Sequence, residues 1–317
     1  MDKAVLDRFS ADLDGLSPRE DRLGVAISGG PDSLALLLLA AGARPGLVEA
    51  ATVDHALRDT SRAEAETVAT ICANLGVPHA ILTVEWPERP ETAIQERARE
   101  ARYRLLDAWL ADRGLCALAT AHHADDQAET LLMRLNRGSG VRGLAGIRPV
   151  ARIPDGDHPL LRPLLGWRRA ELAQVCADAG VHPATDPSNA DDRYERARIR
   201  GAIADAAWLD STALARSAAH LAVADEALEW MVQSLALGRV TDDTDALRVD
   251  PRGLPAELRR RLLLHAFARF GASEPRGGDL MRAITALERS GTVTLSGLRI
   301  AGGSEWRVTR EAPRTRP

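Results

Sequence analysis

The six residues from Ser28 to Ser33, with the sequence S-G-G-P-D-S, constrain the fold of this chain more than any other segment. They follow an apolar run typical of a strand, residues 23–27, and precede an apolar run typical of a helix, residues 34–41. A strand that ends at two glycines and continues as a helix with Pro31 in its first turn gathers unpaired backbone N–H groups around one small volume, at a helix N-terminus. Such a turn is suited to bind an anion.

The residue types within this loop favour a phosphate. Gly29 and Gly30 let the backbone approach a ligand closely and adopt a positive φ, and the hydroxyls of Ser28 and Ser33 add hydrogen-bond donors. Asp32 is a carboxylate beside the expected phosphates, which is explained chiefly by a Mg²⁺ ion between them. The alternative is a tight strand–helix turn with a serine N-cap and no ligand.

Two common phosphate loops are excluded. The form G-x-x-x-x-G-K-[ST] needs a lysine, and the only lysine of the chain is Lys3; the form G-x-G-x-x-G is also absent from this position. The remaining pattern, S-G-G-x-D-S, is similar to the pyrophosphate loop of ATP pyrophosphatases, which adenylate a substrate and release pyrophosphate. This similarity implies ATP as the cofactor, together with Mg²⁺.

Composition sets further limits. A chain of 317 residues is long enough for about two domains. Its net charge of -4 gives no overall basic signal, so a nucleic-acid surface would be local and built from arginine. Cys72, Cys116 and Cys176 are isolated in the sequence, which argues against a disulfide framework, a zinc ribbon or an iron–sulfur cluster made by this chain alone. We expect them to be buried thiols in a reducing cytosol.

Residues 1–16 interleave charges with apolar residues and lack the apolar core of a signal peptide. The longest apolar run, residues 34–41, is too short to span a bilayer. We therefore expect a soluble, cytoplasmic protein without a membrane partner.

Strand-like and helix-like patterns alternate along the first two-thirds of the chain. Strands are predicted at residues 23–27, 47–53, 79–84 and 115–121, and helices at residues 34–41, 61–75, 92–113 and 124–137. This alternation predicts an α/β fold with a doubly wound, mostly parallel, Rossmann-like sheet covered on both faces. Ligands of such sheets bind at the carboxyl ends of the strands, where Ser28, Asp54 and His122 fall. Thr92 and Gln95 predict a capping box at the start of the third of these helices.

The last third of the chain is predicted to be mainly helical. Helical patterns cover residues 211–237, 255–270 and 276–289, and a glycine-rich, strand-like tail follows at residues 292–309. We place a domain boundary near residue 205, with a catalytic domain at residues 1–205 and a smaller, mainly helical substrate-binding domain at residues 206–317.

Residues 120–130, T-A-H-H-A-D-D-Q-A-E-T, pass from a strand end into a helix. Asp126 and Glu129 share a helix face, as do Asp125 and Glu129, and the apolar residues form a separate stripe. We therefore expect these acids to face the ligand cleft or solvent. Acids at a helix N-terminus often do no more than favour the helix dipole. His122 and His123 at the strand tip, close to the phosphate loop, favour a functional role here.

Arginine-rich segments are candidates for binding a polyanion. In the loop R-G-S-G-V-R-G-L at residues 137–144, Gly138 and Gly140 let the backbone lie against the polyanion, and Arg137 and Arg142 contact phosphates. The alternative is a helix C-cap and its loop.

Two further clusters contain arginine: Arg193, Arg196, Arg198 and Arg200 in one, and Arg99 and Arg102 with Tyr103 on the long predicted helix in the other. A solvated helix face would explain the first cluster equally well. An ion-pair lattice with Glu96 is the alternative for the second.

Six motifs together resemble the tRNA(Ile)-lysidine synthetase family. They are S-G-G-P-D-S at 28–33, E-R-A-R-E-A-R-Y at 96–103, T-A-H-H-A-D-D-Q-A-E-T at 120–130, R-G-S-G-V-R-G-L at 137–144, R-P-L-L at 162–165 and D-P-S-N at 186–189. They cover about two-thirds of the chain in the order of the family, and the last third resembles it only loosely. Ala197 departs from the pattern, because the family usually has asparagine there. The chain is also shorter than the longer members.

The resemblance implies a fold like that of the adenine nucleotide alpha hydrolases and the activity of a carbon–nitrogen ligase. ATP would adenylate the wobble cytidine of a CAU-anticodon tRNA(Ile) and release pyrophosphate. The amine of L-lysine would then displace AMP at C2 of the base and form lysidine.

The resemblance also implies roles for individual residues. The ATP-binding residues are Ser28, Gly29, Gly30, Pro31, Asp32, Ser33, Asp54 and His122. The catalytic candidates are Asp32, Asp126, Asp125 and Glu129, and the Mg²⁺ candidates are Asp32 and Asp126. The tRNA-binding candidates are Arg99, Arg102, Arg137, Gly138, Gly140, Arg142, Arg196, Arg198 and Arg200, with residues 206–317 as a tRNA-binding domain. Which carboxylate is the base, and whether the chain forms a homodimer, are left open.

Three other functions compete with this one. A tRNA thiolase shares the phosphate loop but would ordinarily need a paired or catalytic cysteine, and the cysteines here are unpaired. An amidotransferase-type ligase for small molecules would lack the loop at residues 137–144 and need a glutaminase partner. A tRNA-binding protein that uses ATP only as a switch would not need Asp32, Asp126 and Glu129.

Overall fold

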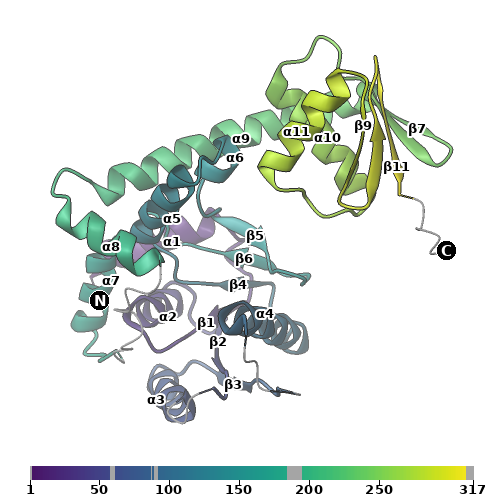
Figure 1. The fold of residues 1–317 in the computed structure, drawn as a ribbon. Coiled ribbons are helices and arrows are strands. Elements are labelled where there is room, and N and C mark those ends of the chain that lie inside the picture. Colours follow the sequence, from purple (N-terminus) through teal and green to yellow (C-terminus); the bar gives the residue numbers. More distant parts are fainter. Residues whose placement is uncertain (1, 58–60, 87, 89–91, 184–194, 312–317) are drawn as a thin grey trace. The chain divides into compact units, whose positions relative to one another are not determined.

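The computed structural model spans residues 1–317 and describes all of them except residues 1, 58–60, 87, 89–91, 184–194 and 312–317 (Figure 1). The chain divides into two compact units, residues 1–222 and 223–317. Each unit has its own hydrophobic core. The predicted domain boundary near residue 205 precedes this division, and the domain limits stay a prediction.

The first unit contains the predicted alternation of strands and helices. Its elements are α1 (Lys3–Asp14), β1 (Leu23–Ala26), α2 (Pro31–Ala43), β2 (Val48–Asp54), α3 (Ser61–Asn74), β3 (His79–Thr83), α4 (Ile94–Arg113), β4 (Ala117–Ala119), α5 (Ala124–Asn136), α6 (Val141–Leu144), β5 (Val150–Arg152), β6 (Pro159–Leu161), α7 (Arg169–Asp178), α8 (Glu195–Asp205) and the start of α9 (Ser211–Arg239). The capping box predicted for α4 is wrong. Ala93 caps this helix with a left-handed backbone, φ 50°, and no side-chain hydrogen bond, so α4 begins too late for Thr92 to cap it.

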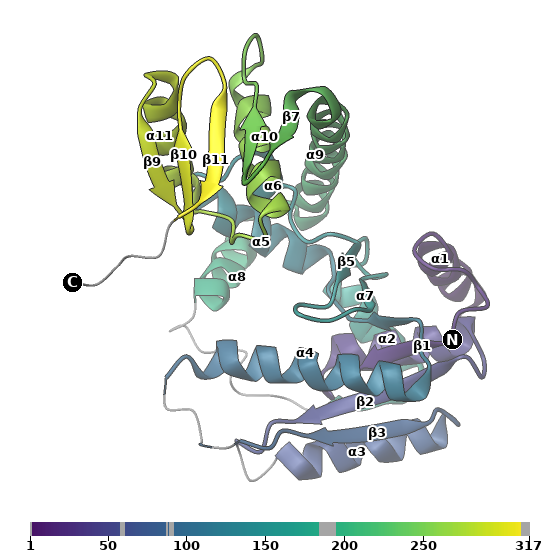
Figure 2. The same cartoon turned by 90° about the vertical axis from the view of Figure 1, so that its right-hand side faces the viewer.

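The six strands of the first unit form one sheet in the order β3-β2-β1-β4-β6-β5. All neighbouring pairs are parallel except β5 with β6. Helices α2, α3 and α7 contribute to the core on one face, and α4 packs on the other (Figure 2). The predicted doubly wound, mostly parallel sheet is therefore confirmed. Since β2, β1 and β4 are parallel neighbours, their carboxyl ends lie together.

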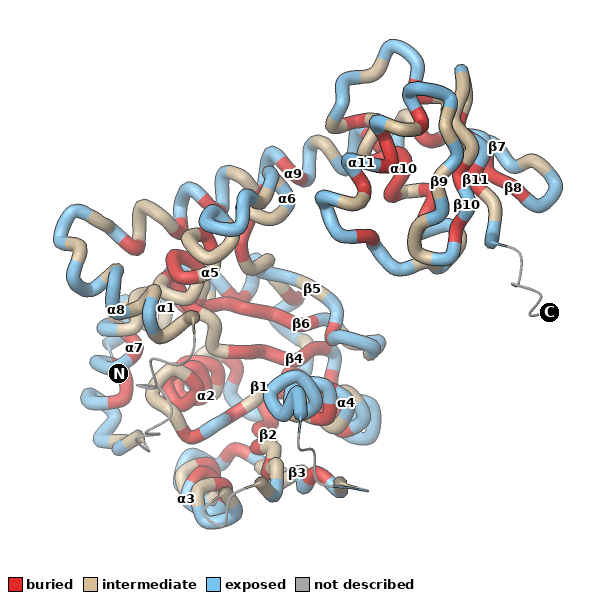
Figure 3. The backbone as a smooth tube through the Cα atoms, viewed as in Figure 1, coloured by how far each residue is buried: buried red, intermediate tan, exposed pale blue. Residues whose placement is uncertain are grey.

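Helix α2 is apolar on every side. Its residues from Ser33 to Ala40 are all buried, because the helix lies between the sheet and helices α1 and α7. A helix that is apolar all round is typical of a protein core. Figure 3 shows the buried residues along α2 and the central strands. This packing fixes the start of α2, and with it the phosphate loop, at the carboxyl end of β1.

The second unit combines the end of α9 with α10 (Ala256–Arg269), α11 (Gly277–Glu288) and a five-stranded antiparallel sheet. The strands are β7 (Val240–Asp243), β8 (Ala246–Val249), β9 (Thr292–Leu295), β10 (Leu298–Ala301) and β11 (Trp306–Arg310), in the order β7-β8-β11-β10-β9. The three predicted helices and the strand-like tail are confirmed. The hairpin β7–β8 was not predicted, because its strands are only four residues long and contain polar residues.

Two of the three cysteines, Cys72 and Cys176, are buried as expected, and burial raises the pKa of each thiol to about 11. Cys116 is exposed, so the expectation is wrong there: this residue lies just before β4, at the amino edge of the sheet. Among the described residues, none of the helices has both the length and the apolar composition of a membrane span.

Gly24 in β1 generates a test of this core. A Cβ atom at Gly24 would lie 2.5 Å from Leu110 Cδ2 and 2.6 Å from Trp109 Cζ3, both in the packed core of α4. We expect Gly24→Ala to lower the free energy of unfolding by about 1–3 kcal/mol, because overpacking forces the core to shift. Urea denaturation measures it. Gly238→Ala is the control, since that helical site is open and should lose nothing.

Candidate active site

The phosphate loop joins β1 to α2. Gly29 adopts φ +82°, which favours glycine, and Pro31 is the first residue of α2. Ser33 Oγ donates a hydrogen bond to Gly30 O over 3.0 Å and accepts one from Ser28 N over 3.2 Å. Within the described part of the chain, no side chain caps the N-terminus of α2. Its first N–H groups are therefore available to an anion.

Asp54, at the end of β2, is engaged by its own loop. Asp54 Oδ1 accepts hydrogen bonds from Ser61 Oγ, at 2.6 Å, and from Ala56 N, at 2.9 Å. Burial would raise the pKa of Asp54, but these two hydrogen bonds, together with the charges of Arg62 and His55, lower it below the usual value. Asp54 thus organises the turn into α3, and its predicted contact with ATP stays a prediction.

His122 lies half-buried just after the carboxyl end of β4, with arginines around it. Its Nδ1 is 3.1 Å from Thr120 Oγ1. Burial lowers the pKa of His122 to about 4; Asp126 opposes this shift, and Arg162 and Arg196 add to it. His122 is therefore neutral at pH 7.

His123 was not predicted as a site residue, yet it lies between the two predicted Mg²⁺ ligands. His123 Nε2 is 3.5 Å from Asp32 Oδ2 and 3.7 Å from Asp126 Oδ2. His123 also caps α5: its Nδ1 accepts from Asp126 N, and its N–H donates to Asp126 Oδ2. Burial alone would lower the pKa of His123, but Asp32 and Asp126 raise it. The sequence does carry a signal for this capping role: His123 stands three positions before Asp126, which is the spacing of a capping box.

Asp32 has an oxygen that the protein leaves unpaired. Asp32 Oδ1 is buried and has no hydrogen-bond partner among the described residues; Arg169 Nε is 4.0 Å away. Asp126 Oδ1, by contrast, accepts from Arg196 Nη2 over 2.8 Å. No group of three or more His, Cys, Asp and Glu side chains suited to a metal occurs in the described residues. The two carboxylates nevertheless fit Mg²⁺, which commonly binds one or two carboxylates plus phosphate oxygens and water.

Glu129 does not face the cleft or solvent, so that expectation is wrong for this residue. Its side chain is 2% exposed, because α8 covers it. Glu129 accepts hydrogen bonds from Arg196 Nε, at 2.6 Å, and from Arg200 Nε, at 2.7 Å. The first turns of α5 thereby hold α8 through one buried carboxylate and two guanidinium groups.

Asp125 holds a different helix. It accepts hydrogen bonds from Arg168 Nε, at 3.1 Å, and from Arg169 N, at 2.8 Å, at the start of α7. Burial would raise the pKa of Asp125, but these donors outweigh it and lower the pKa. The three acids of this segment thus share a helix but hold different elements: Asp125 holds the start of α7, whereas Asp126 and Glu129 both contact Arg196 of α8.

The loop at residues 137–144 remains attached to α5 and α8. Arg137 forms an ion pair with Glu195. Gly138 has φ +67°, Gly140 caps the short helix α6, and Arg142 lies within α6. Gly138 thus adopts a backbone conformation that favours glycine, and the contact of this loop with a polyanion stays a prediction.

The other two arginine clusters differ in their environments. Arg198 is exposed, whereas Arg196 and Arg200 contact acids of α5. Arg193 and the D-P-S-N motif lie outside the described residues. On α4, the guanidinium carbons of Arg99 and Arg102 lie 4.9 Å and 5.1 Å from the centre of the Tyr103 ring. No ion pair with Glu96 is found in the described part of the chain.

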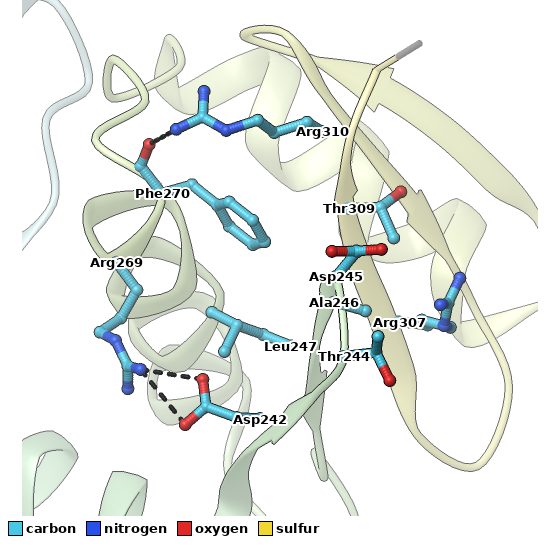
Figure 4. Close-up of a pocket in the computed structure, with 10 residues that line it drawn as sticks. All are labelled: Asp242, Thr244, Asp245, Ala246, Leu247, Arg269, Phe270, Arg307, Thr309 and Arg310. Carbon is cyan, nitrogen blue, oxygen red and sulfur yellow. Dashed lines mark hydrogen bonds and ion pairs between the residues drawn. The ribbon is translucent and has the colours of Figure 1, made fainter.

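A cavity of about 550 Å³ in the second unit lies between the end of α10 and strands β7, β8 and β11 (Figure 4). Arg269 Nη2 donates to Asp242 Oδ1 over 3.0 Å, and Arg310 Nη2 donates to Phe270 O over 2.8 Å. The guanidinium groups of these two arginines thus already hydrogen-bond to groups of the protein itself. The sheet edge of the first unit, with its uncapped helix and unpaired carboxylate oxygen, is the better candidate for catalysis.

Comparison with known proteins identifies close relatives. A family model described as a PP-loop domain matches residues 3–207. The tRNA(Ile)-lysidine synthase of Novosphingobium aromaticivorans is 48% identical over 96% of this chain and 93% of its own length. That of Zymomonas mobilis is 43% identical over 94% of this chain and 91% of its own. A U34-tRNA thiolase from Methanococcus maripaludis has a TM-score of 0.56 at 15% identity, covering 71% of this chain and 80% of that one, which shows a shared fold.

The burial of Glu129 generates a prediction about stability. Glu129→Gln should lower the free energy of unfolding by about 2 kcal/mol, since it removes charge from the hydrogen bonds that hold Arg196 and Arg200, both partly exposed. Thermal and urea denaturation measure the loss. Glu66→Gln, which removes one charge of an exposed pair with Arg62, is the control and should change stability by less than about 0.5 kcal/mol. Equal effects of the two substitutions would contradict the anchoring role.

Proposed function

The chain belongs to the tRNA(Ile)-lysidine synthase family, and from this premise we propose the reaction that its site performs and the residues that perform it. The enzyme is an ATP-dependent ligase that acts on tRNA(Ile). We propose that it joins L-lysine to C2 of the wobble cytidine of a CAU-anticodon tRNA(Ile) and releases pyrophosphate and AMP. The proposal is supported above all by the phosphate loop, whose Asp32 faces His123 at the carboxyl edge of the sheet.

The first half of the reaction activates the base. The C2 oxygen of cytidine attacks the α-phosphate of ATP, the bond to pyrophosphate breaks, and the oxygen becomes part of an AMP leaving group. The N–H groups at the start of α2, with Ser28 and Ser33, stabilise the departing pyrophosphate. Asp32 and Asp126 would hold Mg²⁺, which when bound neutralises charge on the phosphate oxygens. His123 fixes the position of both carboxylates.

The second half transfers lysine. The ε-amine must lose a proton before it attacks C2, so a carboxylate near the base is needed as the acceptor. We assign this role in the second half of the reaction to Asp126, after pyrophosphate has left the site; its partners Arg196 and His123 hold it there. Asp125 and Glu129 are the other candidates for this role, but their hydrogen bonds with α7 and α8 favour roles in positioning Asp126.

The target base lies in an anticodon loop and can enter a pocket without opening a duplex. We propose that Arg137, Gly138, Gly140 and Arg142 hold this loop. Arg198, which is exposed on α8, is suited to a direct phosphate contact. Arg196 and Arg200 act chiefly through the acids of α5, and Arg99 and Arg102 contact RNA from α4. Residues 206–317 are proposed as the domain that binds the tRNA body.

The competing functions are not favoured. A thiolase would need a reactive cysteine, but burial raises the pKa of the Cys72 and Cys176 thiols. Cys116 is exposed at the amino edge of the sheet, opposite the phosphate loop. A protein that uses ATP only as a switch does not need the pairing of Asp32 with His123. A cytoplasmic location and a homodimer stay predictions.

An ATP-cleavage assay tests the proposed function. We expect the enzyme to convert ATP to AMP and pyrophosphate only with a CAU-anticodon tRNA(Ile), and nucleoside mass spectrometry to find lysidine when lysine is also present. Asp32→Asn should lower turnover at least about 100-fold, because the loop loses its charged carboxylate, while the unfolding temperature stays unchanged. A sulfur-containing nucleoside, or cleavage without tRNA, would end the lysidine proposal.

The basic loop makes a separate prediction. Arg137→Ala and Arg142→Ala should each weaken tRNA binding and reduce the slope of log K against log salt concentration by about 0.7–0.9, as expected for one lost phosphate contact. Filter binding at several salt concentrations measures this. Arg19→Ala, at the amino edge of the sheet just before β1, is the control and should leave both values unchanged. If either loop substitution weakened ATP binding as much, the loop would belong to the nucleotide site.

A further inference from the structure

Arg162, which follows β6, is a buried arginine that has no carboxylate partner among the residues that the structure describes. The residue is only 8% exposed. Its Nη1 donates a hydrogen bond to Arg148 O over 2.6 Å, while its Nε is buried and has no partner among the described residues. Arg261 in the second unit shows the usual arrangement: it is equally buried, and it contacts Asp225 and Glu257.

The charges around Arg162 are also positive. Arg162, Arg99 and Arg102 gather at Tyr103, a buried residue of α4, and we call these four residues the Tyr103 cluster. Burial lowers the pKa of Arg162; Tyr103 opposes this shift and Arg99 adds to it. Burial lowers the pKa of Arg102 as well, with the same two neighbours acting on it. No carboxylate contributes to either shift.

An isolated buried charge is costly unless something of opposite sign approaches it. Apolar residues of similar volume would pack at position 162 at lower cost, so the cluster indicates a ligand that brings negative charge. The planar guanidinium group is suited to phosphate, which it binds through two parallel hydrogen bonds.

The Tyr103 cluster lies next to the candidate active site, on the opposite face of the sheet from α2. Arg162 follows Leu161, whose carbonyl oxygen accepts a hydrogen bond from Thr120 N at the carboxyl end of β4, two residues before His122. Arg162 and Arg102 also both act on the pKa of His122. The Tyr103 cluster therefore borders the candidate active site. It lies on the α4 side of the sheet, whereas the phosphate loop begins α2, which packs on the other face.

We propose that Arg162, together with Arg99 and Arg102, forms a phosphate-binding site beside the active site, distinct from the phosphate loop. The existence of the site follows from the buried Arg162 Nε, which has no partner among the described residues, and from the two further guanidinium groups that lie at Tyr103. Only the source of the phosphate depends on the proposed function: it is either a phosphodiester of the tRNA anticodon loop or a phosphate of ATP. Arg162 is the residue that distinguishes this site from a surface cluster.

Arg162→Met tests the proposal, because methionine keeps an unbranched side chain and removes the charge. Arg261→Met is the matched control, a buried arginine that has its carboxylates. The measurements are the unfolding temperature without ligands, the Kd of ATP with Mg²⁺, and the Kd of an unmodified CAU-anticodon tRNA(Ile) transcript at several salt concentrations. All are made without lysine, so they do not depend on lysidine formation.

We expect Arg162→Met to unfold at the wild-type temperature or above it, whereas Arg261→Met unfolds below it. One Kd should rise about tenfold or more. If tRNA supplies the phosphate, the tRNA Kd rises, its salt slope falls by about 0.7–0.9, and the ATP Kd stays within twofold. If ATP supplies it, only the ATP Kd rises. Arg162→Lys should retain part of the affinity, since lysine keeps the positive charge but cannot donate the two parallel hydrogen bonds of a guanidinium group.

Two results would overturn the site. One is that both Kd values of Arg162→Met stay within twofold of the wild type. The other is that Arg162→Met loses as much thermal stability as Arg261→Met, which would make Arg162 a structural residue. If Arg162→Met loses affinity while the wild type forms no lysidine, the phosphate site stands and the proposed reaction falls.

Discussion

The contact between His123 and Asp32 joins the two segments on which the candidate site depends. Asp32 lies in the first turn of α2, directly after β1 and its glycines, and His123 caps the start of α5 after β4. The parallel pairing of β1 with β4 brings these segments together. Two further acids of α5 hold neighbouring helices: Asp125 accepts a hydrogen bond from the start of α7, and Glu129 accepts one from α8. One helix turn thus organises both the ligand-binding edge and the helices around it.

Much of this arrangement could be predicted from the sequence. The phosphate loop, the alternation of strands with helices and the acids around Asp126 are all patterns of neighbouring residues. Because the loop and the acids follow predicted parallel strands, the sequence places them at the carboxyl edge of the sheet. The burial of Glu129 could not be predicted in this way. Its partner Arg200 lies 71 residues further along the chain, so the contact depends on tertiary packing. The lack of a carboxylate partner for Arg162 among the described residues could not be predicted either, because it depends on which side chains the fold brings near Arg162.

The charge distribution shows why net charge is a poor guide to partners of this protein. The chain carries a net charge of -4, yet many of its arginines contact acids within the same unit. These pairs cancel charge locally and position helices. What attracts a polyanion is the small remainder, such as Arg198, which is exposed, and Arg162, whose buried Nε has no partner among the described residues. An average over the sequence cannot detect that remainder.

The burial of α2 on every side has a consequence for how the sequence of this enzyme can change over time. A helix with one exposed face can accept polar residues there, as α3 does, so part of its sequence drifts freely. Residues 33–40 of α2 have no such face. Nearly every substitution in them meets the core, and a shift of the helix would move the phosphate loop that begins it. Selection for a stable fold therefore preserves the catalytic loop indirectly, even at positions that never contact a substrate.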